Sequence, residues 1–133
     1  AVIVVGTPRW SQNVDDAAND PILGYDNLMY TLHFYAGTHK EWLRQKGDYA
    51  MSKGLALFVT ECGGMNADGQ GPVDVESTQA WIEWMEDNDI SYAFWSISDK
   101  KETCSMLYPS AASEGPWHDA DLSPWGAFVK ECL

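Results

Sequence analysis

Short apolar runs alternate with longer polar and amphipathic stretches along this chain. Four of the runs are rich in β-branched and aromatic residues and end close to a glycine or a polar residue, which predicts short buried strands. The predicted strands cover residues 2–5, 27–35, 56–60 and 92–97. Near-continuous apolar strands are typical of parallel sheets, because other elements cover both faces of each strand.

Three segments between and after the strands have apolar residues at helical spacing. They predict amphipathic helices over residues 39–53, 74–88 and 124–131. Thr38 can cap the first of these helices at its N-terminus, and Gly54 fits the position after its last turn. The polar stretch over residues 11–20 shows no apolar stripe, so it predicts a loop with at most one short helical turn.

The order of these elements predicts a single α/β domain over residues 1–133. Strands that alternate with helices form βα units on a parallel sheet, and four units make half of an eightfold barrel or a small open sheet. No glycine-rich nucleotide fingerprint follows the first strand, which argues against nucleotide binding. The chain opens inside an apolar run without a start methionine, so we expect it to be a piece of a longer protein.

The charge balance narrows the range of partners. The formal net charge of -12 argues against nucleic acid and against anionic membrane surfaces. No apolar run approaches the roughly 18 residues of a membrane span. An acidic chain with seven Trp residues is typical of carbohydrate binding, because indole faces stack on sugar rings and carboxylates bind hydroxyl groups. We therefore expect a secreted, extracellular protein that acts on a neutral ligand.

Neither a metal ion nor a cofactor is predicted. Asp15, Asp16 and Asp20 lie close together in the sequence, which raises the question of calcium. Their spacing lacks the central glycine and the terminal glutamate of an EF-hand loop, so the cluster does not match that type of site.

Polar and aromatic side chains gather where the predicted strands end. They are Arg9 and Trp10 after the first strand, His33 and Tyr35 in the second, Glu61 after the third, and Trp95, Lys100 and Glu102 at or beyond the fourth. The ends of parallel strands meet at one edge of the sheet, where α/β proteins bind ligands. A carboxylate with a Tyr and a His between indoles suits glycoside chemistry. A lone Glu at a strand end is also commonly a cap or an ion-pair partner, and that alternative remains open for Glu61.

Four motifs, in this order, resemble those of one family of glycosidases. They are GTPRWSQ at 6–12, HFYAGTH at 33–39, FVTECG at 58–63 and WSISDKKE at 95–102. These motifs are similar to those of glycoside hydrolase family 5, and in particular of its bacterial β-1,4-endoglucanases, the cellulases. The resemblance covers essentially the whole chain and maps it onto strands five to eight of a (β/α)8 barrel. It implies a half TIM barrel of four parallel strands with helices, the C-terminal half.

The resemblance implies an endo-acting, retaining hydrolysis of β-1,4-glucan with Glu61 as the nucleophile. His33 and Tyr35 correspond to the pair that orients this carboxylate and contacts the sugar at the cleavage point. Retaining hydrolysis needs a second carboxyl group about 5–5.5 Å from the first. The family's acid/base Glu lies in an Asn-Glu-Pro motif, which does not occur in this chain. It would lie in an N-terminal half-barrel, so these residues would carry half of an active site.

Four further residues correspond to substrate contacts of the family. Trp10 matches an aromatic on the leaving-group side, Trp95 matches the platform in the subsite before the scissile bond, and Lys100 and Glu102 match a polar pair that holds the next sugar. The expected partner is a β-1,4-glucan chain, with β-mannan as a variant. The alternative function is a carbohydrate-binding or assembling half-barrel with little or no catalysis. Its open sheet edges predict pairing with a second copy or with the N-terminal half-barrel.

The cysteines and the helix stripes have structural rather than chemical interpretations. Cys62 stands where the family usually has an aromatic residue after the nucleophile. Cys62 and Cys104 would lie near the ends of adjacent strands, so they are the favoured disulfide pair, with buried thiols as the alternative. Cys132 would then pair with the other half-barrel. Trp81 and Met85 lie on a helix stripe and are expected in the core.

Overall fold

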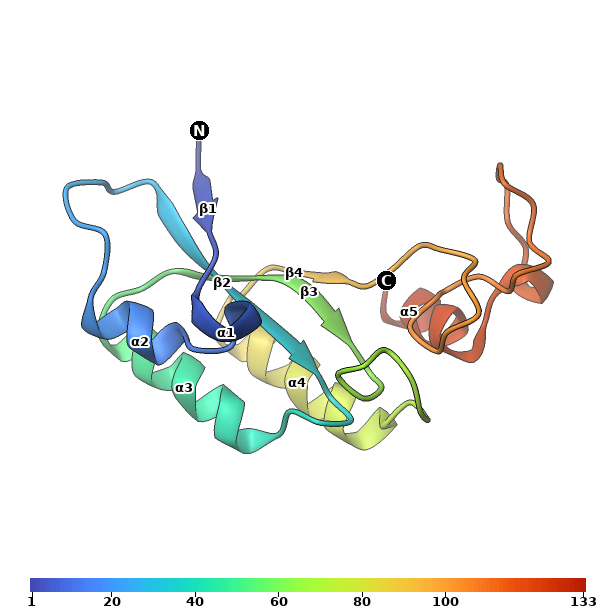
Figure 1. The fold of residues 1–133 in the computed structure, drawn as a ribbon, viewed down its shortest axis with the longest axis horizontal. Coiled ribbons are helices and arrows are strands. Elements are labelled where there is room, and N and C mark those ends of the chain that lie inside the picture. The colour runs from blue at the N-terminus through green and yellow to red at the C-terminus, as the bar shows by residue number, and fades with distance from the viewer.

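The computed structural model describes residues 1–133 and contains one four-stranded sheet. The strands, in their order across the sheet, are β1 (Ile3–Val5), β2 (Leu28–Tyr35), β3 (Leu57–Gly63) and β4 (Tyr92–Phe94) (Figure 1). All neighbouring pairs are parallel. The predicted α/β class with four parallel strands is therefore confirmed, and β1 and β4 form the two edges of the sheet.

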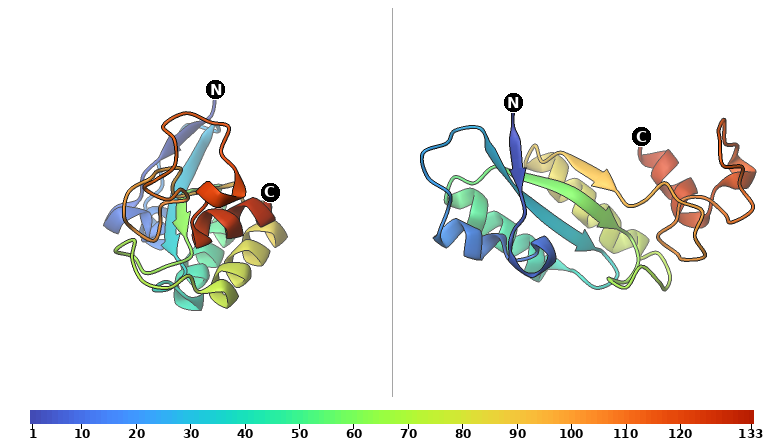
Figure 2. Two further views of the ribbon diagram at one scale, coloured as in Figure 1. Left: turned by 90° about the vertical axis from the view of Figure 1, so that its right-hand side faces the viewer. Right: turned by 45° about the horizontal axis from the view of Figure 1, so that its top comes forward.

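The helices that connect the strands lie on one side of the sheet. They are α2 (Val14–Asn19), α3 (Glu41–Ser52) and α4 (Val75–Asp87) (Figures 1 and 2). Helix α5 (Pro124–Cys132) lies beyond the end of β4, and residues of α4 and α5 line one cavity (Figure 1). Two short turns complete the set, α1 (Pro8–Ser11) directly after β1 and a 3-10 turn (Asp119–Asp121) before α5. No helix has both the length and the apolar character to cross a membrane.

The main core lies between the sheet and its helices. Leu32 and Phe34 of β2 and Val59 of β3 are fully buried, and the ring of Phe34 stacks on that of Trp81 with the centroids 3.9 Å apart. Burying one large apolar side chain contributes about 1.5–3 kcal/mol, so this layer fixes β2 and β3 against the helices. The prediction that Trp81 and Met85 belong to the core is confirmed.

Residues 11–20 were predicted as a loop with at most one short helical turn, but the six-residue helix α2 occupies much of this stretch, so the prediction was wrong in extent. Its buried residues are Val14 and Ala18, which lie four positions apart and pack in the main core. Two apolar residues are too few to register as a helical period in a polar segment.

The assignment of Thr38 as a helix cap was also wrong. Helix α3 begins at Glu41, and Thr38 Oγ1 instead accepts a hydrogen bond from the backbone N–H of Ala67 (3.0 Å).

The favoured disulfide between Cys62 and Cys104 does not form, since all three cysteines are free. The two side chains belong to different apolar clusters. Cys62 faces the main core, where its Sγ donates to the carbonyl oxygen of Ala93 (3.4 Å), and Cys104 packs with Met65 and Trp125 in a smaller cluster beside α5. The alternative of buried thiols therefore describes this pair, and burial raises the pKa of both thiols.

Candidate active site

The ends of β2 and β3 bring the three central candidates together. His33 pairs directly with Glu61 across the two strands, and Tyr35 pairs with Gly63. Strand β3 runs to Gly63 rather than stopping at Thr60 as predicted, so Glu61 lies inside the strand. The sequence therefore predicted the right neighbours, but it placed Glu61 just after the end of the strand, whereas Glu61 is part of β3.

A bulge in β3 aims two consecutive side chains at the same site. The pairing passes from Thr31 opposite Phe58 to His33 opposite Glu61, so two residues of β3 oppose Leu32. Val59 and Cys62 point into the core, and the two residues between them, Thr60 and Glu61, are only partly buried. Bulges break the alternation of side chains and often lie beside active sites. Because of this one, Thr60 and Glu61 both reach His33.

The Glu61 carboxylate is held from two sides. The hydroxyl of Tyr35 donates a hydrogen bond of 2.7 Å to Oε1, and Nδ1 of His33 lies 3.8 Å from Oε2. The other ring nitrogen of His33 is 2.8 Å from Thr60 Oγ1. The glutamate side chain keeps 29% of its surface exposed, so the carboxylate remains accessible while its direction is fixed. A hydrogen bond to a charged acceptor is about twice as strong as one between neutral groups.

The protonation states of the two partners follow from their burial. Burial lowers the pKa of His33, and the neighbouring Glu61 carboxylate opposes this effect without cancelling it. Burial raises the pKa of Tyr35, and its hydrogen bond to Glu61 raises it further. At neutral pH the histidine is therefore uncharged and the tyrosine is a hydrogen-bond donor.

These groups face a cavity of about 390 Å³, which is lined by Trp10, Gln12, His33, Tyr35, His39, Glu61 and Ala67. Glu61 is the only carboxylate in this lining. The indole of Trp10 is 82% exposed, so its face is available to a ligand. An accessible carboxylate next to an exposed indole can bind a sugar and act on it.

The backbone that carries Trp10 is strained. Arg9, Trp10 and Ser11 all have positive φ angles, of 57°, 54° and 59°. A left-handed conformation costs about 1–2 kcal/mol for each residue that has a side chain. The turn is tied down because Thr7 donates from Oγ1 to the carbonyl oxygen of Thr31 in β2 (3.0 Å). Strained backbone of this kind is common at functional sites. Here the strained turn carries Trp10, whose side chain is exposed to solvent.

Three residues that line the cavity were not predicted to belong to the site: His39, Gln12 and Ala67. His39 was predicted only as the start of a helix, but its Nδ1 accepts the backbone N–H of Tyr35 (2.8 Å), and its carbonyl oxygen accepts from the indole of Trp81 (2.9 Å). It thereby anchors the strand end that carries Tyr35 to the core. The HFYAGTH motif contains both residues, so it was the one sequence signal for this contact.

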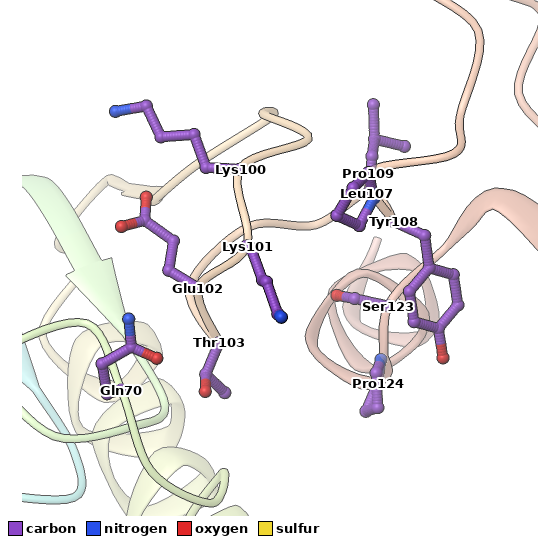
Figure 3. A pocket seen from close by; sticks show the side chains of 10 residues that line it. All are labelled: Gln70, Lys100, Lys101, Glu102, Thr103, Leu107, Tyr108, Pro109, Ser123 and Pro124. Carbon is purple, nitrogen blue, oxygen red and sulfur yellow. The ribbon is translucent and has the colours of Figure 1, made fainter.

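The remaining candidates lie on the far side of β3 from this cavity. Trp95 follows β4 directly, donates its backbone N–H to the carbonyl oxygen of Cys62 (2.8 Å) and is half-exposed, but does not line the Glu61 cavity. Lys100 and Glu102 line a separate cavity of about 430 Å³ between the loop after β4 and the start of α5 (Figure 3). Lys101 points into this space, and Lys100 points away from it (Figure 3).

No group of three or more His, Cys, Asp or Glu side chains is arranged to hold a metal ion. Asp15 lies 3.2 Å from the ammonium group of Lys46, and Asp16 accepts a hydrogen bond of 2.8 Å from the side chain of Asn13. Asp15 and Asp16 of α2 are thus each paired with a neighbouring side chain.

Comparisons with known proteins agree on one family. The family model described as cellulase (glycosyl hydrolase family 5) matches residues 1–101. Endoglucanase Z of Dickeya dadantii is 56% identical over 110 residues, which are 83% of this chain and 26% of that protein. An endoglucanase of Clostridium saccharobutylicum is 47% identical over 132 residues, 99% of this chain and 29% of that protein.

Solved structures are similar to this chain as well, among them the cellulase Cel5C_n, with a TM-score of 0.92 at 47% identity over 98% of this chain and 40% of that chain. A structure from Cytophaga hutchinsonii superimposes with a TM-score of 0.95 at 49% identity, and covers 98% of this chain and 42% of that chain. The chain therefore spans between a quarter and a third of the two curated relatives, and under half of this solved structure.

Proposed function

The chain belongs to glycosyl hydrolase family 5, the cellulase family, and on that premise we propose that it supplies the nucleophile side of an endo-β-1,4-glucanase active site. The observation that carries the proposal is the 2.7 Å hydrogen bond from Tyr35 to Glu61 at the wall of an open cavity. It fixes one oxygen of the carboxylate and leaves the other free to form a bond.

The proposed reaction has two displacements. Glu61 Oε2 attacks the anomeric carbon, the glycosidic C–O bond breaks, and the leaving oxygen takes a proton from a second carboxyl group. Water then attacks the same carbon, the second carboxylate takes its proton, and Glu61 leaves as a carboxylate. Tyr35 holds Oε1 throughout, and the uncharged His33 stands beside Oε2 without neutralising it by proton transfer.

The second carboxyl group is assigned to a part of the protein outside residues 1–133. Glu61 is the only carboxylate at its cavity, and the Asn-Glu-Pro motif of the family's acid/base is absent. The matched relatives are much longer than this chain, which supports the assignment of residues 1–133 to the C-terminal half of a (β/α)8 barrel. The N-terminal half is the proposed partner, and a second copy is the alternative.

The proposed substrate is a β-1,4-glucan chain in an extracellular setting. The relatives that share about half of their matched residues with this chain are named endoglucanases. A solved catalytic domain of Thermobifida fusca endoglucanase Cel5A, 29% identical with a TM-score of 0.89, is in complex with cellotetraose. We assign Trp10 to the leaving-group side, and Trp95, Lys100 and Glu102 to the sugars on the other side.

A mechanism-based label tests the nucleophile without the second carboxyl group. A 2-deoxy-2-fluoro-β-cellobioside with a dinitrophenolate leaving group needs no acid to leave, and its fluorine slows the release of the trapped sugar. Mass spectrometry of a digest should place the sugar on Glu61, and Glu61→Gln should remain unlabelled. A label on another residue, or none despite binding of the sugar, would contradict the proposal.

Binding without turnover is the second candidate function, and the single carboxylate at the cavity favours it for the isolated chain. The rate of release of reducing ends from a soluble β-glucan separates the two candidates. The half-site predicts little or no turnover by residues 1–133 alone and recovery when the N-terminal half is added. Full activity of the isolated chain would rule out a binding-only role.

A further inference from the structure

We propose that the groove between α2 and α3 is a second binding site for a β-1,4-glucan chain, on the helical face of the domain. The choice of glucan rests on the proposed function. The groove is a cavity of about 350 Å³ lined by Asp15, Asn19, Trp42, Gln45, Lys46 and Tyr49. None of these residues lines the Glu61 cavity.

The aromatic part of the site is a pair of exposed rings on one stripe of α3. Trp42 and Tyr49 are 46% and 38% exposed, although both are large and partly apolar. They are seven positions apart, which is close to two full turns, so they lie on the same side of the helix. The rise of 1.5 Å per residue separates them by about 10.5 Å along the axis, close to the length of one two-sugar repeat of a β-1,4-glucan.

Neighbouring contacts hold both rings in place. His39 meets the Trp42 indole edge-on at 5.7 Å between centroids. The Tyr49 hydroxyl donates to Asn19 Oδ1 of α2 (2.6 Å), and the ammonium group of Lys53, which directly follows α3, lies over the Tyr49 ring at 5.4 Å from its centroid. Trp42 and Tyr49 both line the cavity. Rings that are already fixed lose little entropy when a ligand stacks on them.

The polar side chains that line the groove provide hydrogen-bond partners for sugar hydroxyls. Lys46 stands between the two rings on α3 and is held by Asp15 (3.2 Å) and by Asn13 Oδ1 (2.9 Å). The amide groups of Gln45 and Asn19 supply both donors and acceptors. Flat apolar faces combined with a few oriented polar groups are what a sugar chain requires, since each pyranose has an apolar face and a polar rim.

The position of the groove keeps it open in a larger assembly. Helices α2 and α3 lie side by side on the helical side of the sheet (Figure 1). A partner that continues the sheet would add strands at β1 or β4, and those edges do not include this groove. The site would therefore hold a glucan chain to the outside of the enzyme while another segment occupies the Glu61 cavity.

An NMR titration of the 15N-labelled chain with cellotetraose tests the inference. We expect the indole N–H of Trp42 and the backbone amides of α3 to shift, with a dissociation constant distinct from that of the amides around Glu61. Tyr49→Ala should weaken the α3 site about tenfold, because one stacking contact is lost. Tyr25→Ala, which removes an exposed tyrosine elsewhere, should leave both sites unchanged.

The two proposals fail in distinguishable ways. Shifts around Glu61 without shifts on α3 would overturn the second site and leave the proposed function standing. Shifts on α3 alone would support the second site and count against the proposed active site. A Tyr49→Ala variant that is folded and binds at the α3 site as tightly as the wild type would also overturn the inference.

Discussion

The Glu61 carboxylate is oriented by Tyr35, whose hydroxyl donates to it. Tyr35→Phe keeps the ring and removes the hydroxyl that donates to Oε1. A hydrogen bond to a charged group contributes about 1.5–3 kcal/mol, so we expect labelling of Glu61 by the fluorinated cellobioside to slow about tenfold to a hundredfold. Labelling rates by mass spectrometry measure this effect.

Tyr25→Phe is the matched control, because Tyr25 is exposed and lies away from the Glu61 cavity. It should label at the wild-type rate. An unchanged rate in Tyr35→Phe would mean that Glu61 is aimed without help from the hydroxyl. The hydrogen bond would then be structural only.

Two histidines should make the fold sensitive to mild acid. Burial lowers the pKa of both His33 and His39 in the folded chain. The unfolded chain therefore binds more protons as the pH falls below about 6.5, the ordinary pKa of histidine. Their contribution to stability is fully present above that pH and is lost as the pH falls through the lowered values. The urea midpoint should accordingly decrease between neutral pH and about pH 5.

Asp74 and Asp119 titrate in a separate window, because hydrogen bonds from lysines lower the pKa of both carboxyls. A His33→Gln and His39→Gln double variant should flatten the pH dependence of the midpoint. His118→Gln serves as the control, since His118 is exposed. A double variant with the wild-type slope would show that other groups cause the dependence.

The helices α3 and α4 end in the same motif with different residues at its critical position. After α3, Gly54 has a φ of 90°, its N–H donates to Met51, and the next N–H donates to Ala50. After α4, Asp89 takes the equivalent place with a φ of 55°. The N–H of Asp89 donates to Glu86, and the N–H of Ile90 donates to Met85. This is the Schellman arrangement, in which glycine is the favoured residue.

Asp89→Gly should therefore stabilise the chain by about 1 kcal/mol, because glycine avoids the left-handed penalty of a residue with a side chain. Gly54→Ala should destabilise it by a similar amount, for the same reason in the opposite direction. Free energies of unfolding from urea titrations test both. If Asp89→Gly is neutral or destabilising, the carboxylate stabilises this turn in a way that the backbone geometry does not account for.

The elements that were predicted well from the sequence are those that depend on a pattern of neighbouring residues. All four strands were found, and Gly54 was found as the end of α3, because each depends on a run of neighbouring residues. The bulge in β3 could not be found in this way. It depends on which β2 residue faces Thr60 and Glu61, and that pairing joins segments almost 30 positions apart. The same bulge explains why Glu61 was placed outside the strand.

For the molecule as a whole, the motifs identified the family, and the sheet brought His33, Tyr35 and Glu61 together as predicted. They did not predict that Lys100 and Glu102 line a different cavity from Glu61, because the long loop after β4 has no periodic pattern that fixes its course. Gln12 and Ala67 were missed for the same reason, since each belongs to a loop or turn.

The open edges of the sheet give the last prediction. Strand β1 is an edge strand in which Ile3 and Val4 are exposed, as is Val2 just before it, and β4 is the other edge. Unpaired edges with apolar side chains favour association with another chain. Since all four strands are parallel, a twofold axis along the strands would place β1 of one copy beside β4 of the other at two equivalent contacts. Eight strands are enough to close a barrel filled by side chains.

We therefore expect the isolated chain to sediment as a species heavier than 14.8 kDa, and to return to the monomer when the N-terminal half competes for its edges. Val4→Lys should shift the equilibrium toward the monomer, because a charge on an edge strand opposes pairing. Leu23→Lys, at an exposed position outside the strands, should not. Sedimentation velocity across a concentration series measures all three. A wild-type chain that stays monomeric and soluble at high concentration would show that these edges do not drive association.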